Sequence, residues 1–131
     1  MKEILGRYQP QAYALLRIMA ALLFMQHGAQ KILGLLGRDA VSFPSLLFVA
    51  GFIELVGGFL IAVGYRTGFF AFISSGLMAF AYFMRHADMA NFFPIENRGE
   101  LAVLYCFVFL FISAAGSGIW SIDSLLKKKS E

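Results

Sequence analysis

Four long apolar stretches, separated by short polar or glycine-rich breaks, dominate the pattern of hydrophobic and polar positions along the chain. A helix needs about 20 mostly apolar residues to cross the hydrocarbon core of a bilayer. Apolar stretches of that length predict transmembrane helices rather than strands or soluble amphipathic helices. We therefore predict an all-α integral membrane protein, a bundle of four transmembrane helices at about 13–36, 45–65, 68–86 and 100–116.

The breaks between these helices contain the residues that form turns. Residues 37–44 follow the first helix, 64–68 form a tight second connection, and 88–99 form a longer third one. After the fourth helix comes a short amphipathic tail, 121–129, preceded by Trp120. Tryptophan and basic amphipathic segments favour the membrane interface, so we expect the tail to lie there.

Composition supports a membrane environment. The chain has 131 residues, of which 60% are hydrophobic and 15% charged, and its mean hydropathy is +0.73. In ordinary soluble domains roughly half of the residues are apolar. The length predicts a single membrane domain, residues 1–131. The first apolar stretch carries Arg17, His27 and Lys31 and lacks a small-residue cleavage site, so we expect a retained helix rather than a cleaved signal peptide.

Lysine and arginine residues are distributed unequally between the two predicted sides of the membrane. Lys2, Arg7, Arg66, Lys127, Lys128 and Lys129 fall on one side, and Arg38, Arg85 and Arg98 on the other. Cytoplasmic loops carry the excess of these residues, so we expect both termini in the cytoplasm. The net charge of +3 is scattered, apart from the lysines of the tail, and predicts no nucleic-acid partner.

The predicted helices contain ionisable residues that a bilayer should exclude. A charge at the centre of a span costs about 2.5–3.5 kcal/mol even on the lenient insertion scale. Arg17, His27 and Lys31 lie on the first helix and Glu54 on the second. At about 100° per residue, the three residues of the first helix fall within a wedge of roughly 80°, so we expect this face to point into the bundle.

Depth predicts which of these residues meet. His27 lies nine residues before the end of the first predicted helix, and Glu54 nine residues after the start of the second. Each is then roughly 13 Å below the outer surface, and we expect the two side chains to be hydrogen-bonded. Lys31 lies one turn nearer the outside, where His86 ends the third helix and Glu100 begins the fourth. The candidate polar or ligand-binding cluster is Arg17, His27, Lys31, Glu54, His86 and Glu100, open to the outside, with Arg17 near the opposite end.

Structural roles compete with ligand binding for each of these residues. His27 and Glu54 are equally suited to a purely structural hydrogen bond. Lys31 is as well suited to snorkelling toward the outer headgroups as to a cavity, and snorkelling toward the inside is the favoured interpretation for Arg17. For Glu100 the favoured role is a helix-capping box with Asn97. His86 is favoured as a solvated residue at a helix end.

No catalytic motif is present in the sequence. It lacks a glycine-rich phosphate loop, a GxSxG elbow and the paired histidines of a haem site. The two histidines lack the close spacing of a metal site, so no metal is expected. The single cysteine, Cys106, excludes an intramolecular disulfide and is favoured as a packing residue. Any enzymatic role is therefore expected to be that of a non-catalytic subunit.

Residues that carry a family resemblance follow one another along nearly the whole chain. They are Leu16-Arg17, His27-Gly28, Lys31, Glu54, Gly57-Gly58, Gly64, His86, Glu100, and 116–118 with Ser121 and Asp123. In this order and spacing they resemble the DoxX family. The resemblance implies a four-helix protein of the bacterial inner membrane. Ser117 departs from the family pattern, in which proline or alanine is frequent there, and this affects only a turn.

The resemblance also implies functions, because some relatives are described as small subunits of quinone-reducing oxidoreductases and others as partners in membrane-associated oxidoreductase complexes. We expect a membrane subunit of an oxidoreductase system, with a pocket for a quinone-like or other amphiphilic ligand and no cofactor of its own beyond a bound quinone. The expected partners are the lipid bilayer, a soluble or membrane-bound redox protein and further copies of the chain. The alternatives are a non-redox carrier for a small amphiphile or lipid, and a scaffold without a ligand.

Overall fold

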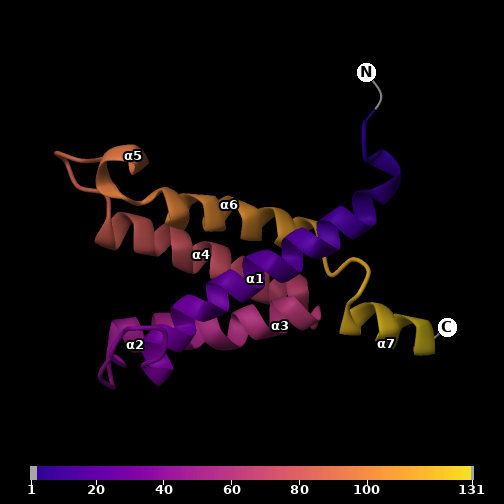
Figure 1. Cartoon of the computed structure of the whole chain (residues 1–131), viewed down its shortest axis with the longest axis horizontal. Helices are drawn as coiled ribbons and strands as arrows, with labels where there is room; N and C mark the ends of the chain where they lie inside the picture. The colour runs from indigo at the N-terminus through magenta and orange to yellow at the C-terminus, as the bar shows by residue number, and fades with distance from the viewer. Residues whose placement is uncertain (1–2, 131) are drawn as a thin grey trace.

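Helices form all the regular structure of the computed structural model, which describes residues 3–130. In chain order they are η1 (Gly6–Tyr8), α1 (Gln9–Leu33), α2 (Leu46–Phe52), η2 (Ile53–Gly57), α3 (Gly58–Val63), α4 (Thr67–Arg85), α5 (Pro94–Asn97), α6 (Glu100–Ala115) and α7 (Ile122–Ser130). Because α2, η2 and α3 follow one another without a break, they form one long helix (Figure 1). All four predicted stretches are helical, with ends that differ from the prediction by at most four residues. Lys2, which contributed to the charge comparison, lies outside the described residues.

The largest shifts are at the two ends of α1, and both have local causes. The helix begins at Gln9 because Pro10 fits the first turn, where its missing N–H leaves no bond unmade. It ends at Leu33, short of the predicted residue 36, because Gly34 adopts a left-handed φ of 63°. The next helix begins after Ser45, whose Oγ accepts a hydrogen bond of 3.1 Å from the backbone N–H of Phe48.

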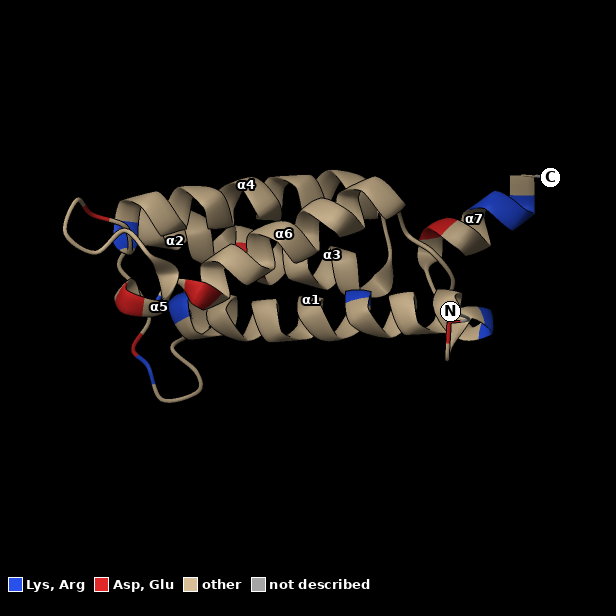
Figure 2. Ribbon diagram, turned by 90° about the horizontal axis from the view of Figure 1, so that it is seen from above, with Lys and Arg blue, Asp and Glu red and all other residues tan. Residues whose placement is uncertain are grey.

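Three helical segments are long and apolar enough to cross a membrane, namely Gly6–Leu33, Leu46–Val63 and α4. The fourth, α6, is apolar but shorter, with 16 residues. Large apolar side chains such as Phe72 and Phe107 cover the outward faces, and the charged residues gather mainly at the two ends of the bundle (Figure 2). An apolar belt between two charged ends is the distribution that a bilayer favours.

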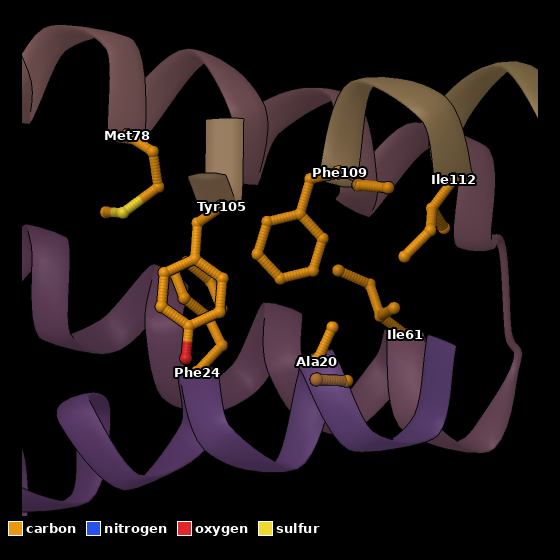
Figure 3. Packing of buried hydrophobic residues seen from close by; sticks show 9 residues of the cluster. Ala20, Phe24, Ile61, Met78, Tyr105, Phe109 and Ile112 are labelled. Atoms are coloured by element: carbon orange, nitrogen blue, oxygen red, sulfur yellow. The ribbon is translucent and has the colours of Figure 1, made fainter. Parts of the chain in front are cut away.

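The helices pack as two pairs. The long helix Leu46–Val63 lies against α1, and α6 runs along α4. A core of buried side chains joins the pairs, and Figure 3 shows Phe24 of α1 beside Tyr105 and Phe109 of α6. The ring centroids of Phe24 and Phe109 are 4.7 Å apart, in an edge-to-face arrangement. Apolar packing therefore holds the middle of the bundle together.

Glycine allows an unusually close approach of α1 to the second helix. A Cβ atom at Gly28 would lie 2.4 Å from the backbone nitrogen of Leu55 and 2.7 Å from the carbonyl oxygen of Gly51. No larger residue fits there without moving one of the backbones. Small residues at such contacts are typical of helices that pack within a membrane, and here the contact brings the polar residues of α1 next to Glu54.

The two ends of the bundle differ in content. One end, which we call the terminal end, carries η1, the turn after α3 and α7. The opposite end, the loop end, carries the start of α2, the end of α4, α5, and the connections 34–45 and 86–93. In both views the N- and C-terminal segments lie at the same end.

Candidate functional site

A pocket of about 610 Å³ opens at the loop end, between the two helix pairs. There the pairs diverge, because α4 packs against η2 and α3 whereas the main neighbours of α2 are α1 and η2. The volume lies within the range of about 300–1,000 Å³ that is typical of small-molecule sites. Its polar lining consists of His27, Lys31, Arg38, Glu54, Arg85, His86, Arg98 and Tyr105.

An ion pair lies in the interior part of this pocket. The ammonium Nζ of Lys31 donates to both carboxylate oxygens of Glu54, at 2.6 and 2.7 Å. The side chain of Glu54 is 3% exposed and that of Lys31 is 15% exposed. A buried carboxylate without a partner is costly, and a cation that donates to both oxygens offsets part of that cost.

Backbone geometry brings the two charges together. Glu54 lies in η2, the π-helical segment of the second helix, and single π-helical turns within α-helices occur frequently at functional sites. Gly51 lies one turn before it, and a Cβ atom at this position would be 2.7 Å from the Cβ of Lys31. The absence of a side chain at Gly51 therefore lets Lys31 pass close to the second helix and reach the carboxylate.

The predicted hydrogen bond between His27 and Glu54 is wrong. Among residues 3–130, Glu54 is paired with Lys31, and no hydrogen bond joins it to His27. Lys31 lies one helical turn, about 6 Å along the axis, nearer the loop end than His27. Its flexible stem spans that distance, so its ammonium group reaches Glu54. His27 lines the pocket beside Tyr105, with the two rings nearly perpendicular and their centroids 6.2 Å apart.

The rim of the pocket is basic. Arg38 from the connection after α1, Arg85 from the end of α4 and Arg98 from the end of α5 all line it. In the sequence these arginines indicate only the orientation of the helices in the membrane. Because all three arginines are predicted on the same side of the membrane, the sequence could have indicated that they lie together.

His86 is fixed at this rim rather than free in solvent. Its Nδ1 lies 3.1 Å from the carbonyl oxygen of Asn97, and its ring stacks on that of Tyr82. The Asn97 amide donates to the Tyr82 hydroxyl at 3.1 Å, and that hydroxyl donates to the carbonyl of Phe92. These bonds hold the connection between α4 and α6 against the end of α4.

Arg17 lies outside the pocket, at the terminal end, so the interpretation that it snorkels is wrong. Its side chain is 0% exposed. The guanidinium donates to the carbonyl oxygens of Ile61 and Ala62, each at 2.7 Å, and to those of Ile119 and Trp120, at 3.2 and 2.8 Å. It thus ties the end of α3 to the segment between α6 and α7.

A second set of bonds strengthens the same junction. Asp123 accepts a bond of 3.1 Å from the backbone N–H of Arg66 and another from the Ser117 hydroxyl, and its own N–H donates to the carbonyl of Gly64 at 3.0 Å. Burial raises the pKa of Asp123, but the bonds from Ser117 and from the backbones of Arg66 and Thr67, with the Arg66 charge, outweigh it and leave the pKa below its usual value. Ser117 therefore has a specific partner in this turn.

Glu100 also lies outside the pocket, and the predicted capping box does not form. The N-cap residue of α6 is Gly99, and no side chain caps the helix. Asn97 belongs to α5, and its Oδ1 accepts a 2.9 Å bond from the N–H of Gly99. Of the six predicted cluster residues, His27, Lys31, Glu54 and His86 line the pocket, and Arg17 and Glu100 do not. Within residues 3–130, no group of three His, Cys, Asp or Glu side chains is placed to hold a metal ion.

Comparison with known proteins places the chain in a family. The profile of the DoxX family matches residues 12–87, which include most of α1, the second long helix and α4. A Haemophilus influenzae protein described as "Uncharacterized protein" is 45% identical over 132 residues, covering 95% of this chain and 98% of the relative. No solved structure gives a significant match. Together with the apolar helices, these similarities show that the chain is a membrane protein of the DoxX family.

Proposed function

We propose that this protein binds a small amphiphile with a polar head group in the pocket at the loop end, as a membrane subunit of an oxidoreductase system. The observation that carries the proposal is the buried Lys31–Glu54 pair within an otherwise largely apolar cavity of about 610 Å³. A pocket with apolar walls and a few convergent polar groups is the typical form of a small-molecule site. The ionisable pair gives the head group both a donor and an acceptor.

A quinone head fits this chemistry. Reduction of a quinone to the quinol takes up two electrons and two protons. A carboxylate and an imidazole in a poorly hydrated site are suited to proton transfer, and Glu54 and His27 both line the pocket. The electrons have to come from another protein, because the side chains of this chain include no electron carrier. The proposal therefore includes a redox partner.

Binding of a neutral quinone tests the first half of the proposal. The purified full chain is titrated with decyl-ubiquinone, and the dissociation constant is measured by isothermal titration calorimetry. Because Glu54→Gln removes the charged acceptor of the site, it should weaken binding about tenfold. Glu100→Gln, outside the pocket, should leave it unchanged. Absence of binding, or equal binding to both variants, would contradict the proposed site.

The redox half is tested separately. The protein is extracted in mild detergent from the membranes in which it is normally made, and the visible absorption spectrum of the purified material is recorded. A redox partner should copurify and add a cofactor spectrum that this chain does not have. A preparation that binds amphiphiles but contains this chain alone would favour the non-redox carrier instead.

The proposal also includes a membrane arrangement with four spans, in the bacterial inner membrane, with both termini in the cytoplasm. Its support is the excess of Lys and Arg at the terminal end and the common position of both termini. Cysteines are introduced singly at Ser42 and Ser130 in a variant lacking Cys106. An impermeant thiol reagent added to whole cells should label residue 42 only. Labelling at residue 130 alone would reverse the arrangement.

A further inference from the structure

The charge of the pocket lining is strongly unbalanced. Lys31, Arg38, Arg85 and Arg98 are cations, whereas Glu54 is the one acidic residue in the lining. Glu54 is already neutralised by Lys31. The three arginines therefore remain as net positive charge around a single cavity.

These arginines have no acidic partner within the described part of the chain. The Lys31–Glu54 pair is the one salt bridge among residues 3–130, and no side-chain hydrogen bond joins Arg38, Arg85 or Arg98 to another residue there. By contrast, the guanidinium of Arg17 donates to four backbone carbonyl oxygens. Guanidinium groups with free donors are suited to phosphate and carboxylate groups, which they bind through paired hydrogen bonds.

Three separate segments supply the charges, namely the connection after α1, the end of α4 and the end of α5. The residue at the end of α5, Arg98, has a left-handed backbone with φ of 60°, which is uncommon for a residue with a side chain. The three side chains are exposed at the mouth of one cavity, and the lining contains no counter-charge for them. An anion at the rim would supply that counter-charge.

The walls of the pocket show where a tail would lie. Leu46 and Val49 on α2 and Phe80 and Met84 on α4 line the pocket. Their side chains are 50–62% exposed. The apolar wall of the pocket is therefore accessible from outside the bundle. An acyl or prenyl chain can enter sideways between α2 and α4 while its head remains at the basic rim.

We propose that the ligand of this pocket is an anionic amphiphile of the membrane, with a phosphate- or carboxylate-bearing head held by Arg38, Arg85 and Arg98 and its tail between α2 and α4. This inference rests on the proposed function, because it names the ligand class of the same pocket. It differs from that function in requiring a negative charge on the head.

Native mass spectrometry of the full chain in a non-ionic detergent tests this proposal. The protein is mixed with equal amounts of phosphatidylglycerol and phosphatidylcholine that have the same acyl chains. We expect at least about a tenfold preference for the anionic lipid, because both lipids carry a phosphate but the trimethylammonium group of phosphatidylcholine cancels its charge and is repelled by the arginines. The double variant Arg85→Gln/Arg98→Gln should lose that preference. The matched double variant Arg7→Gln/Lys128→Gln, which removes two cations at the terminal end, should retain it.

Three further results would distinguish this inference from the proposed function and from binding of a free anion. Equal binding of both lipids by the wild type would overturn the anionic assignment, and the proposed function would stand if decyl-ubiquinone still bound. If neither the lipids nor decyl-ubiquinone bound, both proposals would fail. If inorganic phosphate alone raised the unfolding temperature as much as phosphatidylglycerol did, and through the same two arginines, the site would take a free anion and the assignment of the tail would be wrong.

Discussion

Arginines occupy both ends of this bundle, but they differ in burial and in hydrogen-bond partners. At the terminal end, the guanidinium of Arg17 is fully buried and donates to four carbonyl oxygens of two separate segments. At the loop end, three arginines surround a cavity without an acidic partner within residues 3–130. An arginine whose terminal nitrogens donate to backbone carbonyls holds the fold, whereas an arginine whose donors have no acceptor in the protein is available to a ligand.

The largest effect is expected from removing the side chain of Arg17. Arg17→Met should lower the free energy of unfolding by more than about 4 kcal/mol, because buried carbonyls at the end of α3 and before α7 lose charged donors worth about 1.5–3 kcal/mol each. Unfolding in detergent mixtures gives this value. A loss below about 1 kcal/mol would show that the hydrogen bonds of Arg17 contribute little to stability.

A smaller loss is expected at the ion pair in the pocket. Lys31→Met should cost about 3 kcal/mol, since it leaves the Glu54 carboxylate buried and unpaired. Adding Glu54→Leu should recover part of this loss. A double-mutant cycle should therefore give strong coupling between Lys31 and Glu54.

The matched control is the cycle for His27→Leu and Glu54→Leu, which should be additive within about 0.5 kcal/mol. Strong coupling in the second cycle and none in the first would reverse the assignment of the partner of Glu54.

A substitution at the proposed entry between α2 and α4 should weaken lipid binding and leave the free energy of unfolding unchanged. Val49 lines the pocket and is 52% exposed. Val49→Trp should fill part of the entry and weaken phosphatidylglycerol binding several-fold, because the acyl chain loses its place against the wall. Val56→Trp, a matched change at a position on η2 outside the pocket lining, is the control. Equal weakening by both variants would argue against a tail between α2 and α4.

The smallest effect is expected at Asp123, and it depends on pH. Its pKa is lower in the folded protein than in the unfolded chain. The carboxylate therefore adds stability above its usual pKa of about 3.9, and this contribution disappears as the pH falls through the folded value. Unfolding temperatures measured from pH 6 to pH 3 should fall more steeply for the wild type than for Asp123→Asn. Parallel curves would contradict the assignment.

The long helices were predictable because apolar length and turn residues are local properties of the sequence. The ends of α1 differed from the prediction because Pro10 and Gly34 control them individually. Matched depth and the polar face of the first helix predicted that His27 and Glu54 share a polar cluster, and both line the pocket. The choice of Lys31 as the partner of Glu54 did not, because it depends on the reach of a flexible side chain across Gly51.

The hydrogen bonds of Arg17 could not be predicted from the sequence, for a different reason. Two of its acceptors, Ile119 and Trp120, are about a hundred residues away in the chain. They face Arg17 because the segment after α6 turns at Gly118 and Trp120, which have positive φ angles of 66° and 54°. The basic rim was missed because a cation beside a membrane span is first interpreted as a topology signal.

The most direct test of the distinction between the two ends is a crossed measurement on Arg17→Met and Arg98→Gln. The free energy of unfolding and the preference for phosphatidylglycerol over phosphatidylcholine are measured for both variants and the wild type. Arg98→Gln should unfold within about 0.5 kcal/mol of the wild type and lose most of its lipid preference, whereas Arg17→Met should be strongly destabilised, with its folded fraction retaining that preference. An Arg98→Gln protein with unchanged lipid preference, or an Arg17→Met protein of wild-type stability, would contradict the account.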